Sequence, residues 1–248
     1  MVLVSPRNPL NIGAVARAMA NFGFARLTVV APYEPHWREA QSAVGAEDLL
    51  HHARRTDTLA EAVAACTLVV GTGTRTFRKP EQLVMSLPDL TPKAQRELAL
   101  GGRVAMVFGP EKHGLTREDL VLCHVMVEIP TDARQPSMNL GQAAAVCLYE
   151  LASRALPVQQ GREATDAAGT AMPGTPSAEL ERLAGVVEEA MAAAGYSPRV
   201  MQAANRNDLR VLLRRLGMNS ADTRRVLGLF RRILWRLRAP LGTGRERD

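Results

Sequence analysis

The first 155 residues alternate short apolar runs with stretches in which apolar residues recur every three or four positions. The short runs are rich in valine and leucine, and they lie at residues 2–4, 27–30, 68–70, 104–108 and 125–129. Continuous apolar runs are typical of parallel strands buried on both faces. The pattern therefore predicts the α/β class, with a parallel sheet and helices on both faces.

Four helices are predicted in the same region, at residues 11–22, at residues 58–65, at residues 92–99, and in a stretch entered at residues 137–143 that runs to about residue 154. Asn11 is a capping-type residue and is predicted to cap the first of them. Thr91 is predicted to cap the third, because Pro92 suits the first position of a helix.

The pattern then changes. Residues 156–176 carry three prolines and three glycines among small polar residues and show no apolar periodicity, which indicates a flexible linker. We therefore expect three parts: an α/β domain at residues 1–155, the linker at 156–176, and an arginine-rich helical domain for RNA binding at 177–248.

Two or three helices are predicted in the last part, around residues 178–194, around residues 208–216 and after Ser220. In the last helix apolar residues form one stripe and arginines the other face. The stripe consists of Val226, Leu229, Phe230, Ile233, Leu234 and Leu237. A stripe of this kind needs a partner surface, in its own domain or in a second subunit.

Composition excludes several classes of protein. With 46% hydrophobic and 23% charged residues, the 248-residue chain can bury a core. It has no run of 18 apolar residues and no signal-peptide pattern, so we expect a soluble, cytoplasmic protein without a membrane partner. Three cysteines without C-x-x-C spacing and five histidines without ligand spacing favour neither a disulfide framework nor a metal site.

Charge is distributed unevenly. Residues 1–155 hold 16 basic and 15 acidic side chains, whereas residues 206–238 hold ten basic and only two acidic ones. Guanidinium groups suit phosphate contact, so this cluster indicates a polyanionic partner such as RNA or DNA. The alternative is a solvated helix face in a chain that has only three lysines. The ten are Arg206, Arg210, Arg214, Arg215, Arg224, Arg225, Arg231, Arg232, Arg236 and Arg238.

Three motifs follow predicted strands. The first contains Asn11, Gly13 and Arg17 at the start of the first helix. Gly13 permits close backbone approach, and Arg17 lies one turn further on the same face, where it could reach a phosphate or a carboxylate. A glycine that serves packing and a surface arginine are the alternative interpretation.

The second motif, residues 108–115, follows the fourth predicted strand. Gly109, Pro110 and Gly114 predict a tight loop at the carboxyl edge of the sheet, where open α/β folds bind ligands, and Glu111 is a charged group in that loop. A simple turn is the alternative.

The third motif joins Ile129 to residues 137–143, where Ser137 and Asn139 could cap a helix and bind a ligand at once. A further fragment, residues 71–75, reads Gly-Thr-Gly-Thr-Arg. It lacks the third glycine of a dinucleotide fingerprint and the Gly-Lys-Ser/Thr of a P-loop, which disfavours NAD oxidoreductases and NTPases.

In this order and spacing, the three motifs resemble the signature motifs of the SPOUT superfamily of RNA methyltransferases, and within it the TrmH-like 2'-O-methyltransferases. The resemblance covers residues 1 to about 155. Met138 departs from it, because leucine is usual there. The arginine-rich tail is similar to that of a tRNA-specific branch, which methylates cytidine or uridine 32 of the anticodon loop.

The resemblance implies a sheet whose C-terminal portion is threaded into a deep trefoil knot, S-adenosylmethionine as cofactor, and a homodimer with the active site at the subunit interface. It assigns the cofactor to Thr72, Gly73, Thr74, Gly109, Ile129, Ser137, Met138 and Leu140. It assigns the catalytic polar rim, facing ribose and phosphate, to Asn11, Arg17, Glu111, Ser137 and Asn139. Candidate contacts to the tRNA partner are Arg7, Arg17, Arg206, Arg210, Arg214, Arg224 and Arg231.

Two alternatives remain. The chain could be an RNA-binding protein of the same fold without turnover, although Arg17, Glu111 and Asn139 are all present. It could also modify ribosomal RNA, but such relatives are expected to carry their substrate domain at the N-terminus, and the extra domain predicted here is C-terminal.

Overall fold

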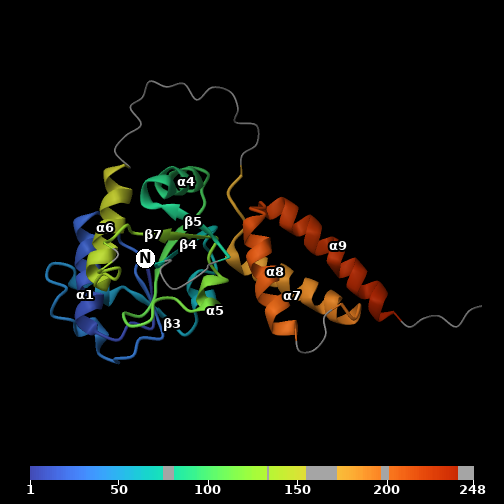
Figure 1. Ribbon diagram of the computed structural model, residues 1–248, viewed down its shortest axis with the longest axis horizontal. Coiled ribbons are helices and arrows are strands. Elements are labelled where there is room, and N and C mark those ends of the chain that lie inside the picture. The colour runs from blue at the N-terminus through green and yellow to red at the C-terminus, as the bar shows by residue number, and fades with distance from the viewer. Residues whose placement is uncertain (75–80, 133, 155–171, 197–200, 240–248) are drawn as a thin grey trace, which may run out of the picture.

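The computed structural model describes residues 1–74, 81–132, 134–154, 172–196 and 201–239 (Figure 1). Within these ranges, seven strands form one sheet in the order β3-β2-β1-β6-β4-β7-β5, and every strand pair is parallel. The strands are β1 (Val2–Val4), β2 (Thr28–Val30), β3 (Arg54–Thr56), β4 (Leu68–Thr72), β5 (Leu83–Ser86), β6 (Val104–Phe108) and β7 (Val125–Glu128). The predicted α/β class with a parallel sheet is confirmed.

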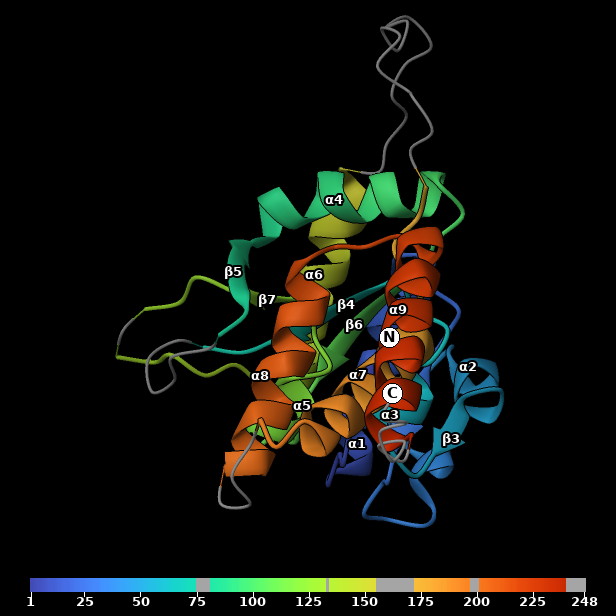
Figure 2. The same cartoon turned by 90° about the vertical axis from the view of Figure 1, so that its right-hand side faces the viewer.

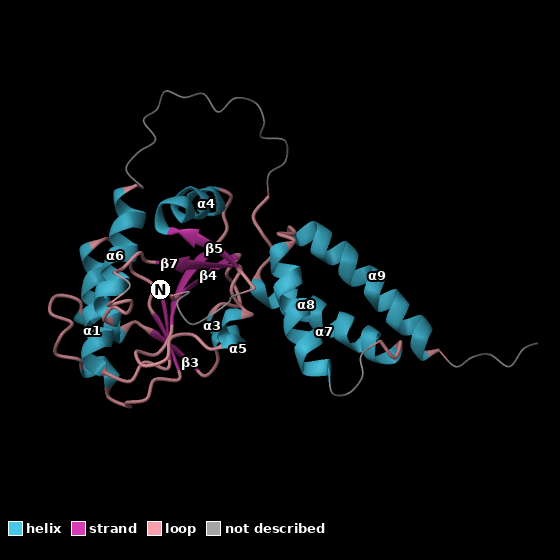
Figure 3. Ribbon diagram, in the orientation of Figure 1, coloured by secondary structure: helices cyan, strands magenta, loops and turns pink. Residues whose placement is uncertain are grey.

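Helices cover both faces of this sheet, as predicted (Figure 3). One face packs against α1 (Pro9–Asn21), η1 (Trp37–Glu39), α2 (Glu47–His51), α4 (Leu87–Ala99) and α6 (Leu140–Ser153). The other face packs against α3 (Leu59–Ala62) and α5 (Arg117–Leu120). Because central strands such as β4 are buried on both faces, the loops that leave their carboxyl ends are the part of the sheet open to a ligand.

Two strands were not predicted. β3 reads Arg-Arg-Thr and lies at one edge of the sheet, where two of its three residues are exposed, so it has no apolar signal. β5 lies at the other edge, and its Leu-Val-Met sequence does carry such a signal. Edge strands bury only part of their surface and need fewer apolar residues. Apolar runs therefore identify central strands more readily than edge strands.

The predicted start of α1 is wrong. The helix begins at Pro9, and the side chain of Asn8, not Asn11, accepts a hydrogen bond from the backbone N of Leu10 at 2.9 Å. An asparagine followed by proline is itself a helix-start signal, because proline at the first position has no N–H to satisfy. Asn11 is thereby left with a side chain that can serve the site.

The predicted start of α4 is also wrong. Ser86 caps this helix by accepting from the backbone N of Asp89, and Pro88 lies in its first turn. Thr91 is buried inside the helix and donates to the carbonyl of Leu87. Pro92 lies on the exposed side, so the helix passes through both predicted start residues.

Three further helices follow the sheet: α7 (Ser177–Ala193), α8 (Gln202–Arg215) and α9 (Ser220–Arg238). Figure 2 shows α8 and α9 on either side of α7. Their small shared core consists of Leu183, Ala184, Val187, Leu213 and Leu227. The predicted stripe of α9 is only partly correct, because Leu234 is buried while Leu229, Ile233 and Leu237 are exposed. The buried face of α9 is centred on Leu227 and Leu234, so the predicted stripe lies on its flank.

Residues just before α7 attach these helices to the sheet. Gly174 pairs with Asn219 in an antiparallel bridge and donates its N–H to the carboxylate of Glu97 at 2.9 Å. The N–H of Ser177 donates to the carbonyl of Cys66 at 2.9 Å. Residues 172–176 therefore differ from the predicted flexible linker, and the remainder of that prediction up to residue 171 lies outside the described residues. In the described ranges, no helix combines the length and apolar character needed to cross a bilayer.

An ion-pair network holds α8 on α7. Arg214 is buried and donates to Glu181 at 2.9 Å, and Arg210 donates to the same carboxylate at 2.8 Å. Arg210 and Arg206 also bond to Glu188. A buried guanidinium depends on its carboxylate partner, because an uncompensated charge in the interior is strongly unfavourable.

Replacing Glu181 should therefore destabilise the fold. Removing one partner of a buried ion pair costs about 3 kcal/mol or more, so Glu181→Ala should lower the free energy of unfolding in urea by roughly that amount. Arg214→Met removes the buried charge together with its need for a partner and should cost clearly less. Arg225→Ala, which breaks an exposed pair with Asp222, is the control. Equal losses in Glu181→Ala and Arg225→Ala would contradict the assigned role of Arg214.

His124 gives the fold a dependence on pH. It is a half-buried side chain next to β4, and its Nδ1 accepts a hydrogen bond from the backbone N of Val69 at 3.1 Å, so the ring is neutral. Burial lowers the pKa of His124 to about 3, and the positive charges of Arg214 and Lys93 act in the same direction. The unfolded chain has a histidine pKa of about 6.5. Between about pH 3 and pH 6.5 it therefore binds more protons than the folded chain.

We expect stability to be complete above pH 6.5 and to fall as the pH drops towards 3. Urea unfolding between pH 7 and 5, above the range in which most carboxylates titrate, should show a slope that approaches about 1.4 kcal/mol per pH unit. His124→Asn keeps an acceptor for Val69 but cannot titrate, so its slope should be flatter. The same slope in both proteins would show that His124 is not the titrating group.

Candidate active site

A cavity of about 470 Å³ opens at the carboxyl ends of β4, β6 and β7, which are neighbours in the sheet. All eight residues predicted to hold the cofactor line it: Thr72, Gly73, Thr74, Gly109, Ile129, Ser137, Met138 and Leu140. They come from three loops that are far apart in the sequence. The volume lies in the range of small-molecule sites, so the cavity can hold a ligand of nucleoside size.

The walls of this cavity are of two kinds. Ile129, Met138 and Leu140 contribute apolar surface, and Leu140 is buried where α6 begins. Main chain at Gly73 and Gly109 contributes polar groups. The hydroxyl of Thr72 donates to the carbonyl of Val107 at 2.9 Å and so ties β4 to β6. Apolar walls with a few polar groups suit a ligand that has a flat base and polar ends.

The loop after β6 is as tight as its sequence predicts. Gly114 donates its N–H to the carbonyl of Pro110 at 2.8 Å and has a φ of +63°, a left-handed conformation that favours glycine. A Cβ on Gly109 would overlap the main chain of Gly114 and Leu115. This loop therefore requires glycine at both positions, and its main chain forms one wall of the cavity.

Hydrogen bonds join three of the predicted catalytic residues. The amide Nδ2 of Asn139 donates to Oδ1 of Asn11 at 2.9 Å, and Nδ2 of Asn11 donates to Oε1 of Glu111 at 2.8 Å. Oδ1 of Asn139 accepts from the backbone N of Gly141 and caps α6, as predicted. The three motif loops are thus connected through side chains.

Glu111 is the last acceptor in this series of hydrogen bonds. Its carboxylate also accepts from the backbone N of Arg7 at 3.1 Å and of Asn8 at 3.2 Å. Burial opposes ionisation, but the hydrogen bonds that the carboxylate accepts outweigh it and lower the pKa of Glu111. An ionised carboxylate with this many donors is suited to hold loops in place rather than to remove a proton.

Arg17 lies apart from these residues. It is exposed on α1 and does not line the cavity. Gly13, in the same motif, serves packing: a Cβ there would overlap the side chain of Ser42 and lie 2.9 Å from the backbone N of Ala43. The packing alternative is confirmed for Gly13, and Arg17 is not among the residues that line the cavity of its own chain.

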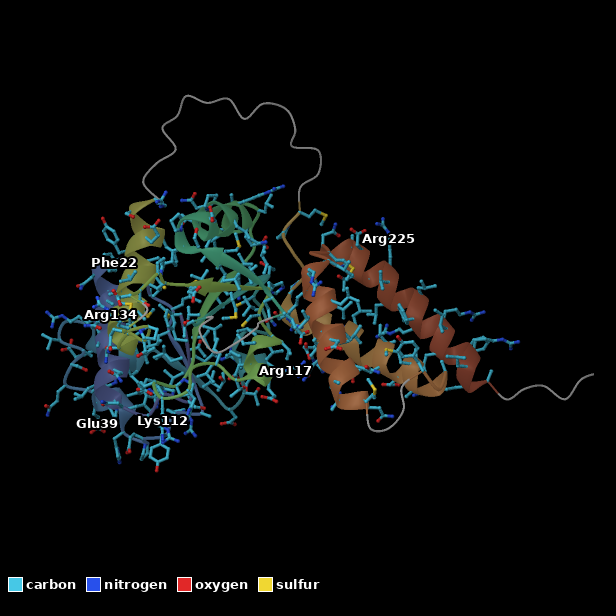
Figure 4. The ribbon with its side chains drawn as sticks, in the orientation of Figure 1. Phe22, Glu39, Lys112, Arg117, Arg134 and Arg225 are labelled. Atoms are coloured by element: carbon cyan, nitrogen blue, oxygen red, sulfur yellow. The ribbon has the colours of Figure 1, made fainter. Side chains whose placement is uncertain are left out.

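Several residues of the site were not predicted. Lys112, His113, Thr131 and Pro136 also line the cavity, and Thr131 donates to the carbonyl of Pro136 across the base of its loop. Lys112 lies at the lower end of the molecule in Figure 4. None of these four residues carries a local pattern that distinguishes it from an ordinary loop residue.

The five arginines of the C-terminal helices that are predicted to bind RNA divide into two groups. Arg206, Arg210 and Arg214 bond to carboxylates of α7, and for Arg214 the prediction is wrong, because its side chain is buried. Arg224 and Arg231 lie exposed on α9, and Arg225 points outward from the same helix in Figure 4. Among the residues that the structure describes, no cluster of His, Cys, Asp or Glu could hold a metal ion.

Comparison with known proteins identifies the family. A model described as the SpoU rRNA Methylase family matches residues 1–149. The tRNA (cytidine/uridine-2'-O-)-methyltransferase TrmJ of Salmonella typhimurium is 36% identical over 202 residues, which cover 79% of this chain and 79% of that protein. The TrmJ of Pseudomonas aeruginosa is 41% identical over 152 residues, covering 61% of this chain and 59% of its own length.

A solved structure agrees with these matches. The crystal structure of TrmJ from Z. mobilis superposes with a TM-score of 0.78 at 32% identity, and the match covers 94% of this chain and 97% of that one. It therefore extends over the helices α7 to α9 as well as the sheet. The resemblance carried by the three motifs is confirmed, and the chain belongs to the SpoU methylase family.

Proposed function

We propose that this protein is an S-adenosylmethionine-dependent methyltransferase that modifies the ribose 2'-hydroxyl of a tRNA nucleotide, and that it acts in the cytoplasm. The observation that carries the proposal is the single cavity in which all eight predicted cofactor residues meet, beside three loops joined by hydrogen bonds. The TrmJ of Salmonella typhimurium is named for cytidine and uridine in tRNA, and that of Pseudomonas aeruginosa for cytidine, uridine and adenosine, which supports tRNA as the substrate. Within tRNA, we propose the cytidine or uridine at position 32.

The residues present fit this cofactor. The apolar side chains of Ile129, Met138 and Leu140 can enclose an adenine ring, while main-chain groups at Gly73 and Gly109 can bond its polar parts. When bound, S-adenosylmethionine supplies an activated methyl group on a sulfonium. The protein must then orient the ribose and provide a route for its proton.

We propose that Arg17 orients the ribose in a neighbouring subunit. A guanidinium is a planar cation with several N–H donors, so it suits a clamp on the adjacent phosphate that polarises the hydroxyl. Since Arg17 lies outside the cavity of its own chain, a homodimer with the site at its interface would place it correctly. The exposed apolar residues Leu10, Val146 and Tyr149 on α1 and α6 offer a surface for that dimer.

The proposal includes two features implied by the family. One is the trefoil knot. The strand order is compatible with it, because β4 lies between β6 and β7, which both follow β4 in the chain. The other is RNA binding by α7 to α9, supported by the exposed Arg224 and Arg231 of α9. The knot would fold the loop after β7 back against the loop after β6, the two loops that line the cavity.

Methyl transfer from labelled S-adenosylmethionine is the direct test. With unmodified tRNA, nuclease digestion should yield 2'-O-methylcytidine or 2'-O-methyluridine from the anticodon loop. A parallel reaction with ribosomal RNA tests the alternative that the family's description suggests. Transfer to ribosomal RNA alone would contradict tRNA as the substrate, and no transfer to either RNA would contradict the proposed function.

Arg17 gives a sharper test of the mechanism. Arg17→Ala should lower the turnover number for tRNA by about 100-fold or more, because it removes a contact needed in the transition state. The affinity for S-adenosylmethionine, measured by calorimetry, should barely change. Arg26→Ala is the control, since Arg26 is exposed at the amino end of β2, whereas the cavity opens at the carboxyl ends of the strands. Full turnover in Arg17→Ala would refute the assigned role.

A further inference from the structure

The loops that follow β1 and β2 carry backbone in an unusual conformation. Ser5, directly after β1, has a φ of +44°, and Ala31, directly after β2, has a φ of +41°. Residues with a side chain seldom adopt this left-handed region, and such conformations persist where the surrounding structure enforces them. Here the enforcing contacts are hydrogen bonds from the backbone N of Ser5 to Val30 and from that of Ala31 to Thr56.

These turns bring Arg7 and Tyr33 together. The backbone N of Tyr33 donates to the carbonyl of Pro6 at 3.2 Å, which joins the two loops. The guanidinium carbon of Arg7 lies 5.6 Å from the centre of the Tyr33 ring, within the range of a cation–π contact. The backbone N of Arg7 is in turn bonded to Glu111, which lines the cavity.

Tyr33 is 70% exposed, whereas the apolar side chains of β1 and β2 are buried. One face of the ring is partly covered by Arg7, and the rest is open to solvent. An exposed aromatic ring next to a guanidinium is the arrangement on which unpaired RNA bases stack, with the arginine available for the phosphate.

We propose that Tyr33 is a positioning residue for the substrate, and that an unpaired base next to the methylated nucleotide stacks on its ring while Arg7 contacts the phosphate. The inference rests on the proposed function, since it names a subsite for the same RNA. Glu111 links this platform of Tyr33 and Arg7 to the three motif loops, so the base is held in a fixed relation to the cavity.

The test separates stacking from other roles of the side chain. Stacking contributes about 10-fold per base or more, so Tyr33→Ala should raise the Kd and the KM for tRNA about 10-fold. The turnover number and the affinity for S-adenosylmethionine should stay within about twofold. Tyr33→Phe keeps the ring and should behave as the wild type, whereas Tyr33→Leu keeps an apolar side chain without a ring and should behave as Tyr33→Ala.

Leu98→Ala is the control, because Leu98 is a large side chain that is 56% exposed at the carboxyl end of α4 and does not line the cavity. An unchanged Kd in Tyr33→Ala, a wild-type Kd in Tyr33→Leu, or an equal loss in Leu98→Ala would overturn the proposal. The binding measurement needs no turnover. If the wild type binds tRNA through Tyr33 but transfers no methyl group, the proposed function fails and the platform stands; if it binds no tRNA, both fail.

Discussion

One carboxylate, that of Glu111, decides how the parts of the site meet. The parallel sheet brings its loops to one edge, but it does not fix how loops from different strands lie against one another. Glu111 accepts hydrogen bonds from the side chain of Asn11 and from two backbone amides of the loop after β1. Asn11 in turn accepts a hydrogen bond from Asn139, which also caps α6. A single anion thus orders loops that leave β1, β6 and β7, and the cavity keeps its shape because these loops cannot move independently.

The central strands and the motif loops could be predicted from the sequence, because strands buried on both faces must be apolar throughout. The edge strand β3 could not, since Arg54 and Arg55 face solvent and only its pairing with β2 makes it a strand. The residues assigned to the cofactor came from the family resemblance, and the structure brings all eight to one cavity. By contrast, Asn8 was not predicted as the cap although Pro9 follows it, because Asn11 is also a capping-type residue and directly precedes the apolar positions of the helix.

The arginines show where composition stops being informative. Their number between residues 206 and 238 indicated a nucleic-acid surface, yet Arg214 is buried and Arg210 is largely so. Their partners, Glu181 and Glu188, lie on a different helix about 20 to 30 residues away, and only the packing of α8 on α7 brings them together. A guanidinium has the same local sequence signal whether it meets a phosphate or a carboxylate of its own chain. The exposed arginines of α9 have no such acidic partner on α7, except for Arg238, which pairs with Glu189.

The attachment of α7 has a geometric consequence. Gly174 and Ser177 are bonded to Glu97 and Cys66, which lie near the amino ends of β4 and β6, whereas the cavity opens at the carboxyl ends of the same strands. The helices nevertheless reach back to α5, where Asp208 of α8 lies 3.9 Å from Arg117, three residues after a loop that lines the cavity. If α7 to α9 bind RNA as proposed, one RNA molecule would engage both parts only if it were long enough to extend from the cavity across α5 to α8.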